Sequence, residues 1–155
     1  FVFLISYMSY QVEFATKWSD FDPNRHMRHT AYNDYAAEVR IRYFTHAGFP
    51  VDEISKDNIG PILFTEHTSF RKEIHSGENI IVNAKLSALN DDKSRWKMRH
   101  EIFNESGKVA AIIDVYGAWI DLEKRKLAVL PSKYDTLLDG LDKTEDFELI
   151  KSKRN

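Results

Sequence analysis

Two aspartates and two histidines lie close together in the segment WSDFDPNRHMRHTAY, residues 18–32: Asp20, Asp22, His26 and His29. Carboxylates and imidazoles bind metal ions, and they also act as bases or nucleophiles in catalysis. Pro23 lies between them and predicts a loop rather than a regular element. The segment therefore has three interpretations: a metal site, a catalytic carboxylate, or a polar loop that caps a helix.

A calcium site is the first metal interpretation, and the spacing argues against it. Asp20, Asp22 and Asn24 match the first, third and fifth ligand positions of an EF-hand loop. Arg25 stands where that loop needs glycine, and Ala31 stands where it needs the bidentate glutamate. The sequence therefore does not predict calcium binding.

A zinc or iron site would use His26 and His29. Histidines three residues apart on a helix can present both imidazoles to one ion, and Asp20 or Asp22 would add a carboxylate. The helical pattern begins only near Thr30, however, and no third histidine is close in the sequence. We therefore predict no metal site.

The remaining interpretations both concern the start of a helix. Asp and Asn residues ahead of a helix commonly cap it and form Asx turns, which would make the loop purely structural. Alternatively, free backbone N–H groups near His29 and Thr30 would polarise a carbonyl group and stabilise an oxyanion. A facing carboxylate would then attack that carbonyl or deprotonate water. Residue types alone leave both interpretations open.

Hydrophobic periodicity predicts the elements that position this loop. Residues 10–18 read as a strand, and residues 30–47 carry an apolar stripe at helical spacing that ends before Gly48 and Pro50. Four strands follow, at residues 62–70, 79–89, 95–103 and 109–120, and their short connections indicate antiparallel pairing. A short helix is expected at residues 132–138. The order predicts an α+β fold, one long helix against a curved antiparallel sheet.

The domain boundaries follow from composition. We expect one domain at residues 8–140 and a charged tail at residues 141–155. Residues 1–7 are apolar but too few to cross a bilayer, and they lack the basic start of a signal peptide. We interpret them as an N-terminal extension.

Charge and cysteine content limit the function classes. The net charge is −2, from 22 basic and 24 acidic residues mixed along the chain, so nucleic acid is not an expected partner. The absence of cysteine excludes disulfides, thiolate zinc sites and a cysteine nucleophile. It also fits a reducing compartment, so we expect a cytoplasmic protein without a membrane span. A single sheet leaves edges to cover, which favours a homodimer.

The run WSDFDPNRHMRHTAYNDYAAEVRIRYFTHAGF resembles the hotdog-fold acyl-CoA thioesterases of the 4-hydroxybenzoyl-CoA thioesterase-like family. Their signature is an aromatic-rich strand end, D-x-D, a turn that often reads G-H-V-N-N, and a tyrosine that opens the central helix. Later segments are also similar, so that the resemblance covers about residues 10–138: Ser76-Gly77-Glu78 before a strand, Glu101-Ile102-Phe103 with a Ser-Gly turn, and Leu130-Pro131 before the last helix.

The resemblance implies a β-α-β-β-β-β hotdog homodimer, in some members paired into a tetramer, with active sites at the dimer interface. It implies that Asp22 is catalytic and that the backbone N–H of His29 polarises the thioester carbonyl. Tyr32 matches the helix-opening tyrosine, and His26 matches the histidine of the G-H-V-N-N variant. Asp20 matches the first aspartate, which we interpret as a turn-shaping residue.

The chain departs from this signature at three positions. Arg25 replaces glycine, so a turn with positive φ there would be strained, and Arg28 and His29 replace asparagines. Two glutamates are rival catalytic acids. They are Glu38 and Glu66, and Glu38 is expected instead to face solvent or to pair with Arg42 one turn later. If Arg25 or His29 blocks the site, the chain would instead be a non-catalytic acyl-thioester-binding module.

The expected reaction is hydrolysis of an acyl-CoA or acyl-carrier thioester to the free acid and the thiol. Asp22 would attack the carbonyl or deprotonate a water, and the sequence does not separate the two roles. No cofactor is expected, because coenzyme A is part of the substrate. Four basic residues are candidates for binding the CoA phosphates, although a purely solvent-exposed role is favoured for each of them: Arg71, Lys72, Arg95 and Lys97.

Overall fold

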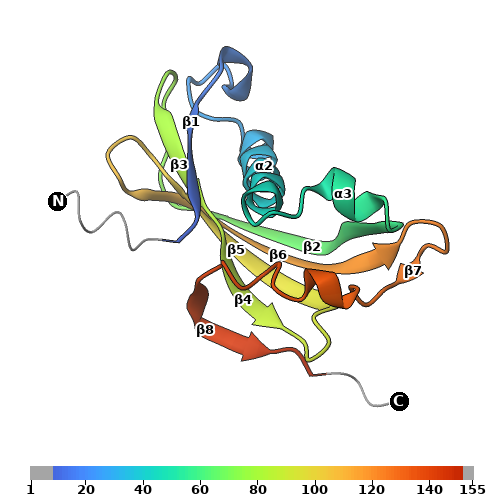
Figure 1. Ribbon diagram of the computed structural model, residues 1–155. Coiled ribbons are helices and arrows are strands. Elements are labelled where there is room, and N and C mark those ends of the chain that lie inside the picture. Colours follow the sequence, from blue (N-terminus) through green and yellow to red (C-terminus); the bar gives the residue numbers. More distant parts are fainter. Residues whose placement is uncertain (1–8, 152–155) are drawn as a thin grey trace.

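The computed structural model describes residues 9–151, in which one long helix lies in the concave face of a curved sheet (Figure 1). This arrangement confirms the predicted α+β class. The expected N-terminal extension, residues 1–7, lies outside the described residues. The elements follow in this order: β1 Gln11–Ala15, a 3-10 turn Trp18–Asp20, α2 His29–His46, α3 Val51–Ser55, β2 Ile59–Phe70, β3 Asn79–Asn83, β4 Lys85–Leu89, β5 Arg95–Phe103, β6 Val109–Asp121, β7 Lys126–Leu127, a 3-10 turn Ser132–Tyr134 and β8 Lys143–Leu149.

The sheet is antiparallel except at one edge. β5 lies at its centre, with β3 and β4 on one side and β6 on the other. β1 extends the sheet beyond β3, and β2 extends it beyond β6. Within residues 9–151, β2 pairs with β6 alone, so its outer edge is open.

The strand predicted at residues 79–89 is two strands, because the chain bends at Ala84. There the N–H of Ala84 leaves the ladder with β5 and donates to the carbonyl of Tyr10, at 2.9 Å. Asn83 and Ala84 are both buried, which breaks the alternation expected of one flat strand. The bend lets β3 pair with β1 while β4 pairs with β8, so that the sheet curves around α2.

The apolar stripe of α2 faces the sheet, as its spacing predicts. Val39, Tyr43 and Phe44 are almost completely buried, and each contributes roughly 1.5–3 kcal/mol by leaving water. Ala36 has no exposed surface, and its small side chain lets the helix approach the strands. The alternation of β5 is also confirmed, since Trp96 and its alternate neighbours point into this core.

The last third of the chain corrects two predictions. The short helix expected at residues 132–138 is a 3-10 turn, Ser132–Tyr134, followed by further turns. The tail expected at residues 141–155 contains β8, which runs parallel to β4. β8 carries charged residues along an exposed edge, so its sequence resembles a tail. Its Asp146 accepts hydrogen bonds from both terminal nitrogens of Arg99, each at 3.1 Å.

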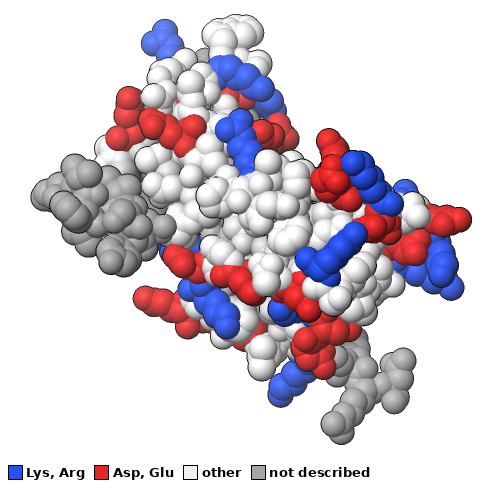
Figure 2. All heavy atoms as spheres, viewed as in Figure 1, with Lys and Arg blue, Asp and Glu red and all other residues white. Residues whose placement is uncertain are grey.

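Two further features concern the linker and the surface. The linker expected at residues 51–60 contains a short helix, α3, which begins directly after Pro50. Figure 2 shows acidic and basic side chains interspersed over this face of the molecule, with neither sign gathered into one large patch. Among residues 9–151, no helix is long and apolar enough to cross a membrane.

Candidate active site at the start of the long helix

Asp20 anchors the loop that precedes α2. Its side chain is 2% exposed, and its carboxylate accepts the N–H of Lys17 at 3.0 Å and the hydroxyl of Tyr35. Its carbonyl accepts the N–H of Arg28 at 2.8 Å. Because a buried carboxylate needs such partners, Asp20 fixes where the loop meets the helix. This agrees with the turn-shaping role predicted for it.

Asp22 forms the turn itself. One of its carboxylate oxygens accepts the N–H groups of Asn24, at 2.8 Å, and His26, at 3.3 Å. Its own N–H donates to the carbonyl of His26 at 2.9 Å. The Asx turn is therefore present, as the structural interpretation predicts. The second carboxylate oxygen, Oδ2, accepts no hydrogen bond from the residues that the structure describes, so it is available to a ligand.

Arg25 has the backbone conformation that glycine adopts most easily. Its φ is +66°, in the left-handed region. For a residue with a Cβ this conformation costs about 1–2 kcal/mol. The predicted strain at this departure from the family signature is therefore present.

Neither aspartate caps α2. The helix begins at His29, its N-cap residue is Arg28, and no side chain accepts a hydrogen bond there. Within the described residues, the N–H groups of His29 and Thr30 have no acceptor, whereas the N–H of Ala31 donates to the carbonyl of Arg28. The helix-capping interpretation is therefore wrong. Two donors remain free at the positive end of the helix dipole.

Tyr32 lies on the first turn of α2, beneath this loop. Its side chain is 4% exposed, and its ring meets Phe70 of β2 edge-on, with 5.1 Å between centroids. Burial raises the pKa of its hydroxyl, and the charges of Glu73, Asp22 and Glu78 raise it further. Tyr32 therefore stays protonated, beside carboxylates from two loops.

The inner face of β2 forms the other side of the site. Thr68 donates to the side-chain oxygen of Asn33 at 2.8 Å, and the amide nitrogen of Asn33 lies 3.4 Å from Glu66. Glu66 is exposed and faces the first turns of α2, so it remains a rival carboxylate. Glu38 instead accepts a hydrogen bond from Arg42 at 2.8 Å, as predicted.

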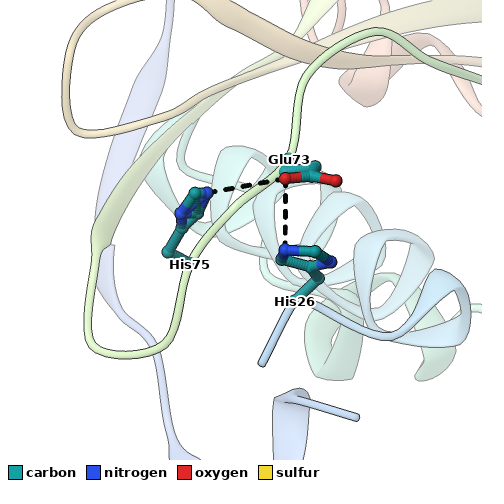
Figure 3. Close-up of side chains that lie close together, drawn as sticks. All are labelled: His26, Glu73 and His75. Carbon is teal, nitrogen blue, oxygen red and sulfur yellow. Dashed lines mark ion pairs between the residues drawn. The ribbon is translucent and has the colours of Figure 1, made fainter. Parts of the chain in front are cut away.

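The side chain of His26 points toward the loop between β2 and β3. Its Nε2 lies 3.1 Å from a carboxylate oxygen of Glu73, and the same oxygen lies 3.6 Å from Nε2 of His75 (Figure 3). Sequence reasoning missed Glu73 and His75, because both are remote from His26 along the chain. The run Ser76-Gly77-Glu78 was visible in the sequence, but the antiparallel bridge that pairs His26 with His75 was not.

The four basic residues predicted to meet CoA phosphates fall into two separate pairs. Arg71 and Lys72 follow β2, and both donate their N–H groups to the carbonyl of Ala110. Arg95, on β5, lies opposite Ala118 of β6. Eight residues of a strand span about 27 Å, at roughly 3.4 Å per residue. One phosphate group therefore cannot contact both pairs in one protomer.

Two hollows lie away from the Asp22 loop. The outer face of the sheet has a groove of about 410 Å³ lined by charged side chains that include Lys97, Arg99 and Glu148. There Lys97 already lies 3.4 Å from Glu148. A smaller hollow of about 140 Å³ lies between α2 and β2, with mostly apolar walls that include Ile41 and Phe44.

A single buried histidine, His100, lies inside the core. His100 has no exposed surface; its Nε2 lies 3.1 Å from the guanidinium of Arg40, and its Nδ1 lies 2.8 Å from the carbonyl of Asn83. Burial lowers the pKa of His100 to about 3, and the adjacent charge of Arg40 acts in the same direction. The ring is therefore neutral, accepting from Arg40 and donating to Asn83.

Comparisons with known proteins support this description of the fold. The family model of the thioesterase-like superfamily matches residues 16–139. Among curated proteins, none matches the chain in sequence. Similar solved structures include a Staphylococcus aureus protein in complex with CoA (20% identity, 85% of this chain and 82% of that one, TM-score 0.77).

Two further structures of this kind are named as thioesterases. One is a DHNA-CoA thioesterase from Staphylococcus aureus (19% identity, 84% of this chain and 86% of that one, TM-score 0.75). The other is a 1,4-dihydroxy-2-naphthoyl-CoA thioesterase from Synechocystis (19% identity, 86% and 98%, TM-score 0.75). Likeness at such identities shows the fold, and it confirms the predicted hotdog arrangement.

Proposed function

Because the chain belongs to the thioesterase-like superfamily, we propose that it hydrolyses an acyl thioester of coenzyme A to the free acid and the thiol. One observation carries the proposal: among residues 9–151, a carboxylate oxygen of Asp22 and the first N–H groups of α2 have no hydrogen-bond partner, and both lie within one short segment. The CoA bound to one similar structure, and the thioesterase activity named for two others, support the choice of substrate.

In the proposed reaction, the thioester oxygen accepts a hydrogen bond from the backbone N–H of His29. The helix dipole favours the negative charge that develops on that oxygen. Asp22 then attacks the carbonyl carbon, the C–S bond breaks, and the thiolate leaves with its electron pair and takes a proton from water. A second water hydrolyses the mixed anhydride and restores Asp22. Alternatively, Asp22 deprotonates a water that attacks directly.

Tyr32 and His26 have supporting roles in this proposal. Tyr32 packs beneath the loop with its hydroxyl protonated, which suits a group that donates a hydrogen bond to the substrate or to Asp22. The backbone N–H of His26 donates to the carboxylate of Asp22 and so holds that carboxylate in the Asx turn. For the CoA phosphates we favour Arg71 and Lys72, because they precede Glu73 in a loop that contacts the residues after Asp22.

We also propose that the active unit is a homodimer that covers the open edge of β2. Leu63, Phe64 and Phe70 of this strand are 37–54% exposed, which is unusual for several large apolar side chains on one strand. Glu66 and Phe70 lie on the inner face of β2, beside α2, so a second protomer here would complete the wall of the site. A tetramer and an acyl-carrier thioester remain further proposals for the assembly and the substrate.

The test is release of free thiol from a series of acyl-CoA and aryl-CoA thioesters. Asp22→Asn is expected to lower kcat by roughly 10²–10⁴-fold, because a carboxamide is neither a nucleophile nor a base. The matched control is Asp34→Asn, which removes an exposed carboxylate from α2 outside the site and should leave kcat unchanged. The protein has no cysteine, so thiol reagents detect only the product.

Each other outcome of this assay points to a specific error. Undiminished turnover in Asp22→Asn, with turnover lost in Glu66→Gln, would transfer the catalytic role to Glu66. If the wild-type protein binds CoA thioesters but releases no thiol from any of them, the chain is the non-catalytic binding module. The exposed side chains of Arg25 and His29 would then be the first residues to replace.

A further inference from the structure

We propose that His26, Glu73 and His75 form a binding site for a divalent transition-metal ion, with Zn²⁺ as the expected occupant. Figure 3 shows the three side chains converging from two loops, with the carboxylate of Glu73 between the imidazoles. Their ligand atoms lie within 4.8 Å of one another. The sequence predicted no metal site, because the helical pattern that would pair His26 with His29 begins only near Thr30 and no third histidine is close in the sequence.

The distances fit a tetrahedral ion. Nitrogen and oxygen ligands lie about 2.0–2.1 Å from Zn²⁺, which places neighbouring ligand atoms of a tetrahedron about 3.3 Å apart. The oxygen of Glu73 lies 3.1 Å from Nε2 of His26 and 3.6 Å from Nε2 of His75, on either side of that value. Small side-chain rotations would therefore bring all three atoms to bonding distance.

The backbone already fixes the two loops against each other. The N–H of Met27 donates to the carbonyl of Ile74 at 2.9 Å, and the N–H of Ser76 donates to the carbonyl of Arg25 at 3.3 Å. Met27 and Ile74, each adjacent to a histidine of the cluster, are buried in the core. Because these anchors hold the ligands in place before an ion arrives, binding would need little reorganisation.

The donor set selects the kind of ion. Two imidazoles and one carboxylate form the protein ligand set of zinc hydrolases and of the ferrous facial triad, with at least one position left for water. Calcium and magnesium prefer oxygen ligands alone. Glu73 neutralises one of the two charges of the ion. Glu78 adds a second negative charge nearby, since it accepts the N–H of His75 at 2.6 Å.

The ion would affect the loop that carries Asp22. His26 contributes its side chain to the cluster and its N–H to the carboxylate of Asp22, so one residue links the two places. A bound ion would therefore link the turn that contains Asp22 to the loop between β2 and β3. The site itself stands whether or not the protein hydrolyses thioesters, because none of its evidence depends on that reaction.

The test is direct metal binding to the full-length, untagged protein after it has been stripped with EDTA. Calorimetric titration with Zn²⁺ should show one ion per chain, and Co²⁺ should give visible absorption bands of a low-coordinate site. His75→Ala and Glu73→Gln should each weaken Zn²⁺ binding by more than the roughly 10–100-fold that changes to outer-shell groups cost. Zn²⁺ should also raise the melting temperature of the wild type more than that of either variant.

The control variant is His67→Ala, which removes an exposed histidine of β2 outside the cluster and should leave Zn²⁺ binding unchanged. Glu73 and His75 are also exposed, so their variants should retain the circular dichroism of the wild type without metal. The proposal is overturned if the wild type binds no Zn²⁺, or if His75→Ala binds it as tightly as the wild type does.

Discussion

Among residues 9–151, histidines occupy two kinds of site whose main difference is their exposure to water. In one, His26 and His75 flank Glu73 at the surface, where the three side chains are 39–63% exposed. In the other, His100 lies in the core between Arg40 and the carbonyl of Asn83, with no exposed surface. The same side chain therefore occupies two opposite environments within one domain.

The difference shows how environment divides structural from functional histidines. Burial and a neighbouring cation hold His100 neutral, so both ring nitrogens are committed to hydrogen bonds within the core. At the surface, a carboxylate faces the two imidazoles and water has access, so a ligand can reach all three side chains. We therefore assign the buried histidine to stability and the exposed cluster to binding, and the following experiments test that division.

The largest expected effect is on folding stability. His100→Ala should lower the free energy of unfolding by about 3–5 kcal/mol, because it leaves a cavity and removes the partner of a buried guanidinium. His75→Ala, without metal, should change it by less than about 0.5 kcal/mol, since the side chain is exposed. Urea unfolding followed by circular dichroism measures both. Equal losses in the two variants would contradict the division.

The second effect is the dependence of stability on pH. The folded-state pKa of His100 is about 3, well below its ordinary value of 6.5, so only the unfolded chain takes up a proton between these values. Stability should therefore fall as the pH is lowered from 6.5 toward 3, with a contribution from His100 of up to about 1.4 kcal/mol per pH unit, and return as the pH rises.

The matched comparison uses two variants. His100→Gln removes the titrating ring of His100, and His75→Ala leaves that ring in place. The difference between the wild-type and His100→Gln unfolding curves isolates the contribution of His100 from that of the carboxylates. His75→Ala should keep the wild-type slope. Identical slopes in the wild type and in His100→Gln would mean that His100 is not held neutral in the core.

A smaller effect is expected at the buried anchor of the Asp22 loop. Tyr35→Phe removes the hydroxyl that donates to Asp20, and it should cost about 2 kcal/mol because a buried carboxylate loses a partner. Tyr10→Phe is the control, since the hydroxyl of Tyr10 makes no hydrogen bond among residues 9–151. Thermal unfolding measures both variants. A Tyr35→Phe protein as stable as the control would show that Asp20 does not depend on this bond.

The smallest effect should be a gain in stability. Arg25→Gly should raise the free energy of unfolding by roughly 0.5–1 kcal/mol, because glycine relieves the left-handed φ but gains more freedom in the unfolded chain. Asn24→Gly, at a neighbouring position outside the left-handed region, should instead lower stability or leave it unchanged. If both glycine variants behave alike, the turn at Arg25 stores no strain.

Local periodicity was sufficient to predict much of the fold. The stripe of α2 and the alternation of β5 each depend on residues close together in the chain, and both were predicted correctly. The bend at Ala84 depends on a bond to Tyr10, and β8 depends on pairing with β4, so neither leaves a local signal.

The same limit applies to the site. Asp22 and the start of α2 are adjacent in sequence, so their proximity could be predicted, although the helix was expected to begin one residue later. The contact of His26 with His75 and Glu73 required the tertiary fold. The burial of Arg40 beside His100 could not be predicted either, because a charged residue on a helix usually faces water.

The most direct test of the proposed site is a crystal structure with a CoA ketone analogue, in which a methylene group replaces the thioester sulfur and prevents hydrolysis. We expect the ketone oxygen to lie about 2.7–3.1 Å from the backbone N–H of His29 or Thr30. The free carboxylate oxygen of Asp22 should face the carbonyl carbon. An analogue bound in the charged groove on the outer face of the sheet, with its carbonyl remote from α2, would contradict the proposed site.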